Sequence, residues 1–384
     1  MSKKDSSPEN DLPSGKSGLE RYDVLDTDGA RTSGLTGIHK VQSKSINKYK
    51  VKTAPELTPQ FEQERERAAR IKHLLDSIHP GGNVPEAISL AGISFAGKDL
   101  ERTRFSHNNL KNCNLREGKL RDSHWMNCDL SGVDLRKADL RGCIFDGCNL
   151  NAADLRHANL EDARIIDCNL FAANFDHCTL DQAVVDHCEM GAQSFHNSSC
   201  KDMRLYSSHI IHGFFDNADL SGADIRNVLF RNCTLTSTRF QNSRLDDCMF
   251  RGCDSFQDGP VFSGSKLHKV IMMDCEFSSS NLAKTRFNQC TWERVDLDSA
   301  LLDETQFNEV NFHEGVFKNC YTLNKAPSFN RCRLDHMVID QTDLTTAQFN
   351  HSSFVGAIIR DSDFSDWELK HTGLDVETVV EYLD

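Results

Sequence analysis

The sequence predicts an all-β solenoid, a tube built from stacked coils of chain, with a helix near its start and another at its end. Two patterns indicate this fold. A large apolar residue recurs at every fifth position from Leu90 to Phe250. A small residue stands two positions before most of these large residues, as at Cys113, Ala138 and Ala153. A period of five fits neither a helix nor an uninterrupted strand, so the chain must turn after each short extended segment.

The two apolar positions also indicate which side chains form the core. Residues two apart on extended backbone point to the same side, so the small and the large residue both face into the tube. The residue between them faces out and is usually Asp or Asn, as at Asp139, Asp154 and Asn159. Two inward residues in five explain how a chain with only 38% hydrophobic residues can fold.

The repeated unit resembles the A(D/N)LXX signature of the pentapeptide-repeat family. The best matches are Ala138-Asp139-Leu140, Ala153-Asp154-Leu155 and Ala158-Asn159-Leu160. The resemblance covers most of the chain and implies a right-handed quadrilateral β-helix with four pentapeptides per coil. With the pattern continuing to Leu369, about 14 coils are expected, spaced by about 4.8 Å.

The ends of the chain lack this period. Residues 1–57 are polar and are predicted to be disordered. Their lysine run from Lys40 to Lys52 is interpreted as a solvated linker, or alternatively as a partner or lipid contact. Residues 58–89 are predicted to form a helix and a linker that cap the first coil, with Thr58 as the N-cap; a partner-binding helix is the alternative.

The repeats themselves are predicted to span residues 90–374. Residues 375–384 are predicted to form a short C-terminal capping helix, because Asp375 suits the N-cap position. Val376, Val379, Val380 and Leu383 then fall on one face of that helix.

The register breaks twice, near residues 255–260 and 322–327. Each break adds two residues and ends in a proline, Pro260 or Pro327. We expect two corner loops, with Asp258 and Lys325 at their tips as candidate partner contacts. Counting along the chain places the loops on opposite walls, about 17 Å apart along the axis. A repeat that merely tolerates extra residues is the alternative.

The chain has 15 cysteines, nearly all in the small inward position. This placement predicts buried, free thiols that act as small hydrophobic residues, and hence a reducing compartment. Cys128, Cys148, Cys168 and Cys188 should stack along one edge, and a zinc ladder there is the alternative. No CxxC pair supports it, so no metal site and no cofactor is assigned.

Charge and hydropathy narrow the classes of partner. A net charge of −13 argues against direct nucleic-acid binding and favours a protein partner with basic groups. No apolar run is long enough for a transmembrane helix. The start, Met1-Ser2-Lys3-Lys4, lacks the apolar core of a cleavable signal peptide. The expected location is the bacterial cytoplasm, or a host cell reached by export without such a signal.

Two Asp-His-Cys strings suggest a Cys/His nucleophile, at Asp176-His177-Cys178 and Asp186-His187-Cys188. In each string the cysteine should point inward while the histidine occupies an outward corner, which separates nucleophile from base. We therefore assign no catalytic residue and expect no enzyme. His157 and His177 should instead stack on one edge of the tube as exposed corner residues, and a metal-binding or pH-sensing role is the alternative.

The favoured function is a non-enzymatic protein–protein interaction scaffold. Some members of the family that this chain resembles are effectors exported by bacterial secretion systems, and residues 1–57 would then carry the export signal. The alternative is the branch of the family whose acidic rods mimic DNA and bind gyrase, a type II topoisomerase. The acidic C-terminal two thirds favour it. The long N-terminal region opposes it, as do the near-neutral early coils with their stacked Arg116, Arg136 and Arg156. The partner's identity is not evident from the sequence, which also leaves a homodimer open.

Overall fold

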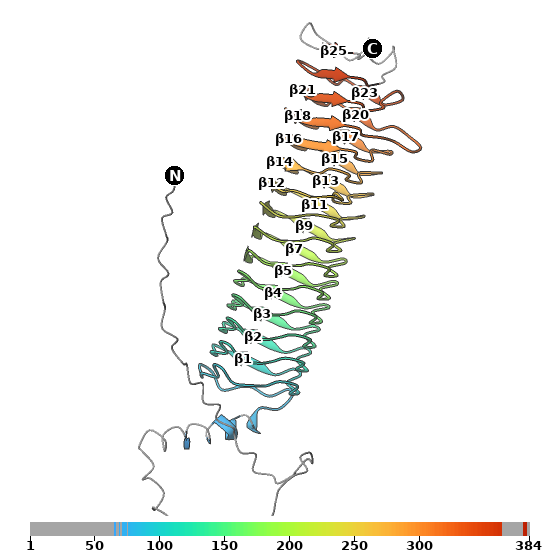
Figure 1. Ribbon diagram of the computed structural model, residues 1–384. Helices are drawn as coiled ribbons and strands as arrows, with labels where there is room; N and C mark the ends of the chain where they lie inside the picture. Colours follow the sequence, from blue (N-terminus) through green and yellow to red (C-terminus); the bar gives the residue numbers. More distant parts are fainter. Residues whose placement is uncertain (1–64, 67–68, 70, 75, 363–378, 382–384) are drawn as a thin grey trace, which may run out of the picture. The chain divides into compact units, whose positions relative to one another are not determined.

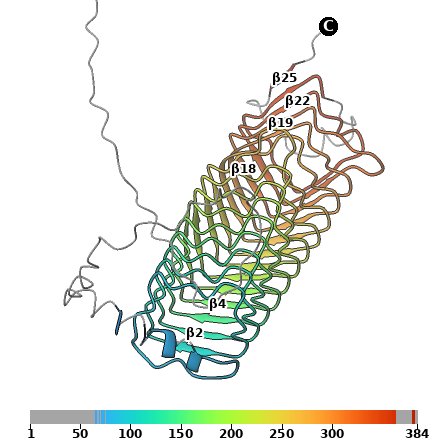
Figure 2. The same cartoon turned by 60° about the horizontal axis from the view of Figure 1, so that its bottom comes forward.

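The computed structural model describes residues 65–66, 69, 71–74, 76–362 and 379–381, all within one compact unit that spans Glu62–Asp384. This unit is a stack of parallel β-coils that follow one another along a common axis (Figure 1). The predicted solenoid is therefore confirmed. Seen after a 60° turn, successive coils enclose the same core (Figure 2).

A 13-stranded parallel sheet forms one side of the tube. Its strands are β1 (Arg104–Ser106), β2 (His124–Met126), β3 (Ile144–Asp146), β4 (Arg164–Ile166), β5 (Val184–Asp186), β7 (Arg204–Tyr206), β9 (Asp224–Arg226), β11 (Arg244–Asp246), β13 (Lys266–His268), β15 (Arg286–Asn288), β17 (Gln306–Asn308), β20 (Ser328–Asn330) and β23 (Gln348–Asn350).

The remaining strands belong to a second parallel sheet. They are β6 (Glu189–Gly191), β8 (His209–Ile211), β10 (Leu229–Arg231), β12 (Met249–Arg251), β14 (Ile271–Glu276), β16 (Thr291–Asp298), β18 (Asn311–His313), β19 (Val316–Lys318), β21 (Arg333–Asp335), β22 (Val338–Asp340), β24 (Ile358–Arg360) and β25 (Val379–Glu381). The long strands β14 and β16 continue around a corner of the tube and so join two of its sides.

Four columns of paired outward residues define four walls. Wall 1 is the 13-stranded sheet. Wall 2 begins with the column Asn109, Asp129, Asn149, Asn169, Glu189 and continues through β8, β10 and β12. Wall 3 contains Asn114, Asp134, Asp154 and, further along, Asp254, Glu276 and Asp296. Wall 4 contains Lys119, Asp139, Asn159 and, further along, Arg239, Val261, Asn281, Leu301 and Tyr321.

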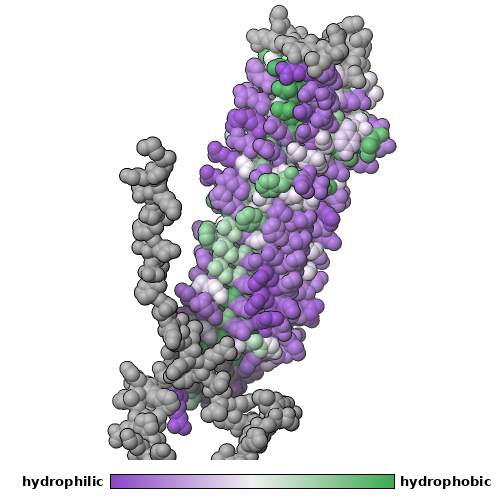
Figure 3. All heavy atoms as spheres, viewed as in Figure 1, coloured by the Kyte–Doolittle hydropathy of each residue, from purple (hydrophilic) through white to green (hydrophobic). Residues whose placement is uncertain are grey.

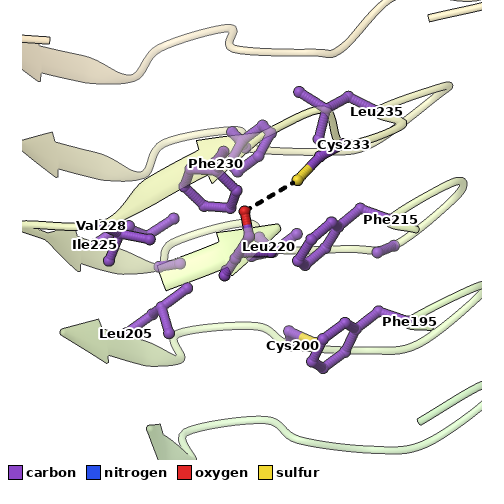
Figure 4. Close-up of a cluster of buried hydrophobic side chains, with 14 of the residues drawn as sticks. Phe195, Cys200, Leu205, Phe215, Leu220, Ile225, Val228, Phe230, Cys233 and Leu235 are labelled. Atoms are coloured by element: carbon purple, nitrogen blue, oxygen red, sulfur yellow. Dashed lines mark hydrogen bonds between the residues drawn. The ribbon is translucent and has the colours of Figure 1, made fainter. Parts of the chain in front are cut away.

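The large inward residues fill the tube, as predicted. Figure 4 shows Phe195, Phe215 and Phe230 beside aliphatic residues of neighbouring coils. Aromatic rings from successive coils stack on one another, and the Phe105 and Trp125 rings lie 3.9 Å apart with planes tilted by only 2°. Because coils repeat at about 4.8 Å, equivalent side chains are held close to ring-stacking distance.

The last two residues of each five-residue unit form the turn at a corner of the tube. The second residue after most of the large apolar residues is in the left-handed region, as at Asn112 (φ 55°) and His157 (φ 62°). Asn, Asp, His and Gly tolerate this conformation best. The outward Asp or Asn supports the same turn, because its Oδ1 accepts the N–H two residues later, as from Asn151 to Asn149 at 3.1 Å.

The 15 cysteines are buried and form no disulfide bonds, as predicted. Several thiols donate a hydrogen bond to a backbone carbonyl of the preceding coil, for example Cys178 to Leu155 O at 2.8 Å and Cys233 to Ile210 O at 3.6 Å (Figure 4). Burial raises the pKa of the Cys113 and Cys290 thiols to about 11. Such thiols remain protonated at neutral pH.

The N-terminal end of the stack begins before residue 90. Asn83 pairs with Arg104, and Val84 is buried in the core. Helical turns precede this first coil at residues 65–66, 69, 71–74 and 76–77. Leu74 and Ile78 from this segment pack against the core. The role of this segment as a cap stays a prediction, and the predicted N-cap at Thr58 lies outside the described residues.

The predicted C-terminal helix is wrong where the structure describes it. Val379–Glu381 form strand β25, which pairs in parallel with β24 through Val379 with Ile358 and Val380 with Ile359. β-Branched valines suit a pleated strand, and the last coil offers unpaired backbone groups that a further strand can satisfy. The other residues of the predicted helix lie outside the described part of the chain. No helix among the described residues is long and apolar enough to cross a membrane.

Candidate functional site

Both insertions interrupt the tube at its corners. The first insertion loop, residues 255–260, lies between Asp254 on wall 3 and Val261 on wall 4. The second insertion loop, residues 322–327, lies between Tyr321 on wall 4 and Ser328 on wall 1. The register then continues with two residues added, since Leu245 pairs with Leu267 and Phe307 with Phe329.

The two loops therefore flank one wall, and the predicted placement on opposite walls is wrong. Wall 4 runs from Val261 at the end of the first loop through Asn281 and Leu301 to Tyr321 at the start of the second. These three steps correspond to about 14 Å along the axis. The count along the chain overestimated the rotation because it included the residues of both loops. One flat partner can therefore touch both loops.

Of the four residues predicted to mark these loops, the two prolines are not at the surface. Pro260 and Pro327 are buried in the small inward position. Their carbonyl groups accept the N–H groups of Asn281 and Gln348 in the next coil, both at 3.2 Å. Each proline thus ends its loop and returns the chain to the stack. Asp258 and Lys325 are exposed, as expected for loop tips.

The first loop displays an aromatic side chain. Phe256 is 77% exposed, the largest value among the exposed large hydrophobic residues that the structure describes. Its N–H donates to Thr236 Oγ1, one coil earlier, at 3.2 Å. Gly259 is buried, and a Cβ there would lie 2.6 Å from Ser280 N of the next coil. Ser237 N–H of the preceding coil also donates to Asp258 O at 2.7 Å, so the loop is held against the coils on both sides of it.

The second loop is organised by a buried carboxylate. Asp303 is only 5% exposed. Its Oδ1 accepts the backbone N–H groups of Leu323 at 3.2 Å, Asn324 at 2.7 Å and Lys325 at 2.9 Å. These hydrogen bonds, with burial as a smaller opposing effect, lower the pKa of Asp303 from 3.8 to about 2. Three backbone donors on one carboxylate oxygen strongly favour its charged form.

The second loop also exposes apolar side chains. Leu323 is 69% exposed and Tyr321, at the start of the loop, is 44% exposed. The loop projects from the side of the tube beside β17 and β20 in Figure 1, and hydrophobic atoms protrude at the same place in Figure 3. Phe256, Tyr321 and Leu323 are not among the residues that the sequence predicted for these loops. The sequence feature that could have indicated them is a large apolar residue at an outward position where the register breaks.

The candidate catalytic strings do not assemble a site. Cys178 is buried and bonded to a backbone carbonyl, while His177 occupies a left-handed corner (φ 59°). The His177 ring stacks on that of His157 at 4.9 Å with a tilt of 5°, as predicted. In the second string, His187 Nδ1 lies 2.8 Å from Asp186 Oδ1 and Cys188 is buried. No group of three or more His, Cys, Asp or Glu among the described residues could hold a metal ion.

The stacked arginines are also engaged within the repeat. Arg136 Nη2 lies 2.6 Å from Asp134 Oδ2, and its Nε reaches Asp154 of the next coil at 3.4 Å. Arg156 pairs with Asp154 in the same way at 2.7 Å. The early part of wall 3 is thus close to neutral along its surface.

A solenoid of five-residue units with alternating inward residues defines the class of protein. The chain matches the model of the pentapeptide repeats family in 8 copies, over residues 88–122, 109–147, 128–165, 148–185, 215–252, 275–313 and 328–366. The chain belongs to the pentapeptide-repeat family. No curated protein matches it.

Several solved structures are similar to parts of the chain. QnrB1, a plasmid-mediated fluoroquinolone resistance protein, is 14% identical, covers 52% of this chain and 92% of its own, and has a TM-score of 0.34. The pentapeptide repeat protein Rfr23 from the cyanobacterium Cyanothece 51142 is 25% identical over 32% of this chain and 97% of its own, with a TM-score of 0.29. A pentapeptide repeat protein from the thylakoid lumen of Arabidopsis thaliana is 22% identical, covers 26% of this chain and 69% of its own, and has a TM-score of 0.25.

Proposed function

We propose that this chain is a non-enzymatic scaffold that binds a protein partner through the wall between its two insertion loops. The observation that carries the proposal is the exposure of Phe256 and Leu323, one on each loop, at the two edges of wall 4. Elsewhere on the described tube most large apolar residues lie in the core; Met126, Phe171 and Phe214 are exposed as well, but less than Phe256 and Leu323.

Rigid loops that expose large apolar side chains are typical of binding surfaces. Leaving a leucine or phenylalanine in water forgoes about 1.5–3 kcal/mol of burial free energy. Interface anchors are enriched in aromatic residues that enter a pocket on the partner. Because each loop is fixed to the coil below it, little conformational entropy is lost when a partner binds.

Photo-cross-linking in the producing cells tests this proposal. A photoreactive amino acid is placed at position 257 or 324, beside the exposed side chains, and at Lys269 on the far side of the tube as a control. We expect protein adducts from positions 257 and 324 that disappear when Phe256 and Leu323 are both changed to serine. Adducts that form equally well at all three positions, or no adducts at either loop, would contradict the proposal.

The proposal extends to export into a host cell without a cleavable signal peptide. Its support is the polar composition of residues 1–57, which lie outside the described residues. A fusion of residues 1–57 to a reporter enzyme should be secreted by a bacterium with an active secretion system. Secretion should stop in a strain that lacks the system. Retention of the fusion in both strains would remove export from the proposal.

A second candidate function is binding to gyrase as an acidic mimic of DNA. The observation that favours it is the net charge of −13 together with the column of Asp254, Glu276 and Asp296 on wall 3. A gyrase supercoiling assay with the purified chain tests it directly. Inhibition that is relieved by neutralising this column would support DNA mimicry, and unchanged supercoiling would exclude it.

A further inference from the structure

The C-terminal half of wall 3 carries a column of carboxylates without cations. Asp254, Glu276 and Asp296 follow one another in successive coils. Among the described residues, no lysine, arginine or histidine forms an ion pair with any of the three. Burial and the neighbouring Glu276 raise the pKa of Asp254 and of Asp296. Coils about 4.8 Å apart thus hold like charges next to one another.

In the early coils of the same wall, the outward carboxylates are neutralised by arginines. In the early coils, an arginine two residues after the outward aspartate pairs with it, as Arg136 does with Asp134. The corresponding positions beside the carboxylate column hold Phe256, Ser278 and Asp298. The exposed phenylalanine of the first loop therefore replaces the arginine at the edge where the unpaired charges begin.

Wall 4 changes its character over the same coils. Its outward column is polar through Asp139, Asn159 and Arg239. Beyond the first loop it becomes largely apolar, with Val261, Asn281, Leu301 and Tyr321. An apolar column on wall 4 and an acidic column on wall 3 thus meet at the corner that carries Phe256. We call this corner, with its two columns, the acidic–apolar edge.

A hollow beside the carboxylates has room for part of an incoming side chain. It measures about 290 Å³ and is lined by Glu276, Asp296, Asp298, Val316 and Lys318, among others. Lys318 interacts with Asp298, where it helps to lower the pKa, although a hydrogen bond from Asn319 is the larger cause. Glu276 and Asp296 remain free to receive a cation, and Val316 offers apolar contact for the methylene stem of a lysine or arginine.

Shape and charge together limit the occupant. A second copy of this chain that docked by the same edge would bring carboxylates and apolar side chains rather than cations, so the charges of the column would stay uncompensated. The edge is convex and only about 14 Å long, on the order of a few hundred Å², well below the roughly 800 Å² per partner of a standard protein interface. A flexible peptide segment can bend over a convex edge, whereas a rigid helix touches only its crest.

We propose that the acidic–apolar edge binds a flexible cationic peptide segment of a partner protein, with lysine or arginine on wall 3 and apolar side chains on wall 4. This inference rests on the proposed scaffold function and names the chemistry of the partner. The two columns are five residues apart in the chain, as from Glu276 to Asn281, which sets their distance at about 17 Å or less. The segment therefore carries its basic and its apolar residues about five positions apart.

The test uses a short fluorescein-labelled peptide with a lysine block, a glycine–serine spacer and a leucine–phenylalanine block. Two matched peptides replace lysine by glutamate, or the apolar block by serine. Fluorescence anisotropy with the full chain at about 0.15 M salt gives the Kd. One variant neutralises the column (Asp254→Asn, Glu276→Gln, Asp296→Asn) and another removes the anchor (Phe256→Ser).

Two control variants match these changes elsewhere on the tube. Asp162→Asn, Asp167→Asn and Asp247→Asn together remove three charges at exposed corners, where asparagine tolerates the left-handed backbone. Phe171→Ser removes another exposed phenylalanine, 52% exposed, from the wall 2 side. Far-UV circular dichroism of each variant verifies that the coils are retained.

We expect the lysine–apolar peptide to bind, and both test variants to weaken it at least about tenfold. The two control variants should change the Kd less than about twofold. Equal binding of the lysine–serine peptide, or equal weakening by the charge control, would show generic attraction to an acidic rod and overturn the inference. So would the absence of any peptide binding. If loop-specific cross-links persist in that case, the scaffold function stands and only the cationic chemistry fails.

Discussion

Asp303 accepts the backbone N–H of Lys325 at 2.9 Å, although the two residues belong to successive coils and only Lys325 lies in a register break. The same oxygen also accepts the N–H groups of Leu323 and Asn324. The second insertion loop is thus built around a carboxylate of the coil beneath it. The first loop lacks such a carboxylate and is joined to the coil beneath it by the bonds from Phe256 N–H to Thr236 Oγ1 and from Ser237 N–H to Asp258 O.

Removing this carboxylate should loosen the second loop without unfolding the tube. Asp303→Ala leaves three N–H groups without their charged acceptor, and a hydrogen bond to a charged group contributes about 1.5–3 kcal/mol. We expect hydrogen exchange at Leu323, Asn324 and Lys325 to speed up roughly 10- to 100-fold. Thr236→Ala is the matched control and should affect only the first loop. Unchanged exchange at all three amides in Asp303→Ala would show that the loop holds its shape by other contacts.

The same carboxylate predicts a pH dependence of the second loop. The folded pKa of Asp303, about 2, lies below its ordinary value of 3.8. Because the pKa is lowered in the folded protein, the ionised Asp303 stabilises the second loop fully above pH 3.8. This stabilisation is lost as the pH falls from about 4 through about 2. The NMR signals of Tyr321 and Leu323 should therefore shift between about pH 5 and about pH 2 in the native protein. The Asp303→Asn variant should show no such transition.

Gly259 should be intolerant of any side chain. A Cβ there would meet backbone atoms of Ser278 and Ser280, which cannot rotate away as a side chain can. We expect Gly259→Ala to destabilise the protein by about 1–3 kcal/mol through overpacking. Gln257→Ala, two residues earlier and exposed, is the control and should have almost no effect. Urea denaturation measures both, and an alanine at position 259 with wild-type stability would contradict the close packing of the first loop on the next coil.

Shortening either loop should restore an ordinary coil. Deleting Gln257 and Asp258 brings Gly259 to the corner position, where glycine adopts the left-handed conformation readily. Deleting Lys325 and Ala326 leaves Asn324 at the equivalent corner. We expect each deletion variant to keep the β-rich circular dichroism spectrum of the parent. A molten or aggregated product would show that the loops are required for folding.

The thiols should react slowly in the native protein. All 15 cysteines are free and buried, and for Cys143 and Cys248 burial raises the pKa to about 12. Since the thiolate is the reactive species, a thiol reagent at pH 7 should modify few of them within minutes. The full complement should react at once in denaturant. Rapid native labelling of many cysteines would mean that the coils open far more often than the packing indicates.

The solenoid could be predicted from the sequence because its information is local. A small residue, an outward residue and a large residue on extended backbone alternate by geometry alone, so the inward set through Phe250 follows from position in the unit. The same reasoning placed Cys178 inside and His177 at a corner, and it predicted that His157 and His177 stack. Each of these follows from counting in fives, without knowledge of any distant contact.

Three features depend on contacts between coils, and only the tertiary structure decided them. The pairing of Val261 with Asn281, and of Leu301 with Tyr321, places both insertions beside wall 4, whereas counting through the loops placed them on opposite walls. Burial of Asp303 arises because the second loop folds over it, and strand β25 forms because β24 offers it a backbone edge. Within an unbroken repeat the local pattern fixes every neighbour in the next coil. At a break or an end, the neighbours are chosen by long-range packing, which a local pattern does not encode.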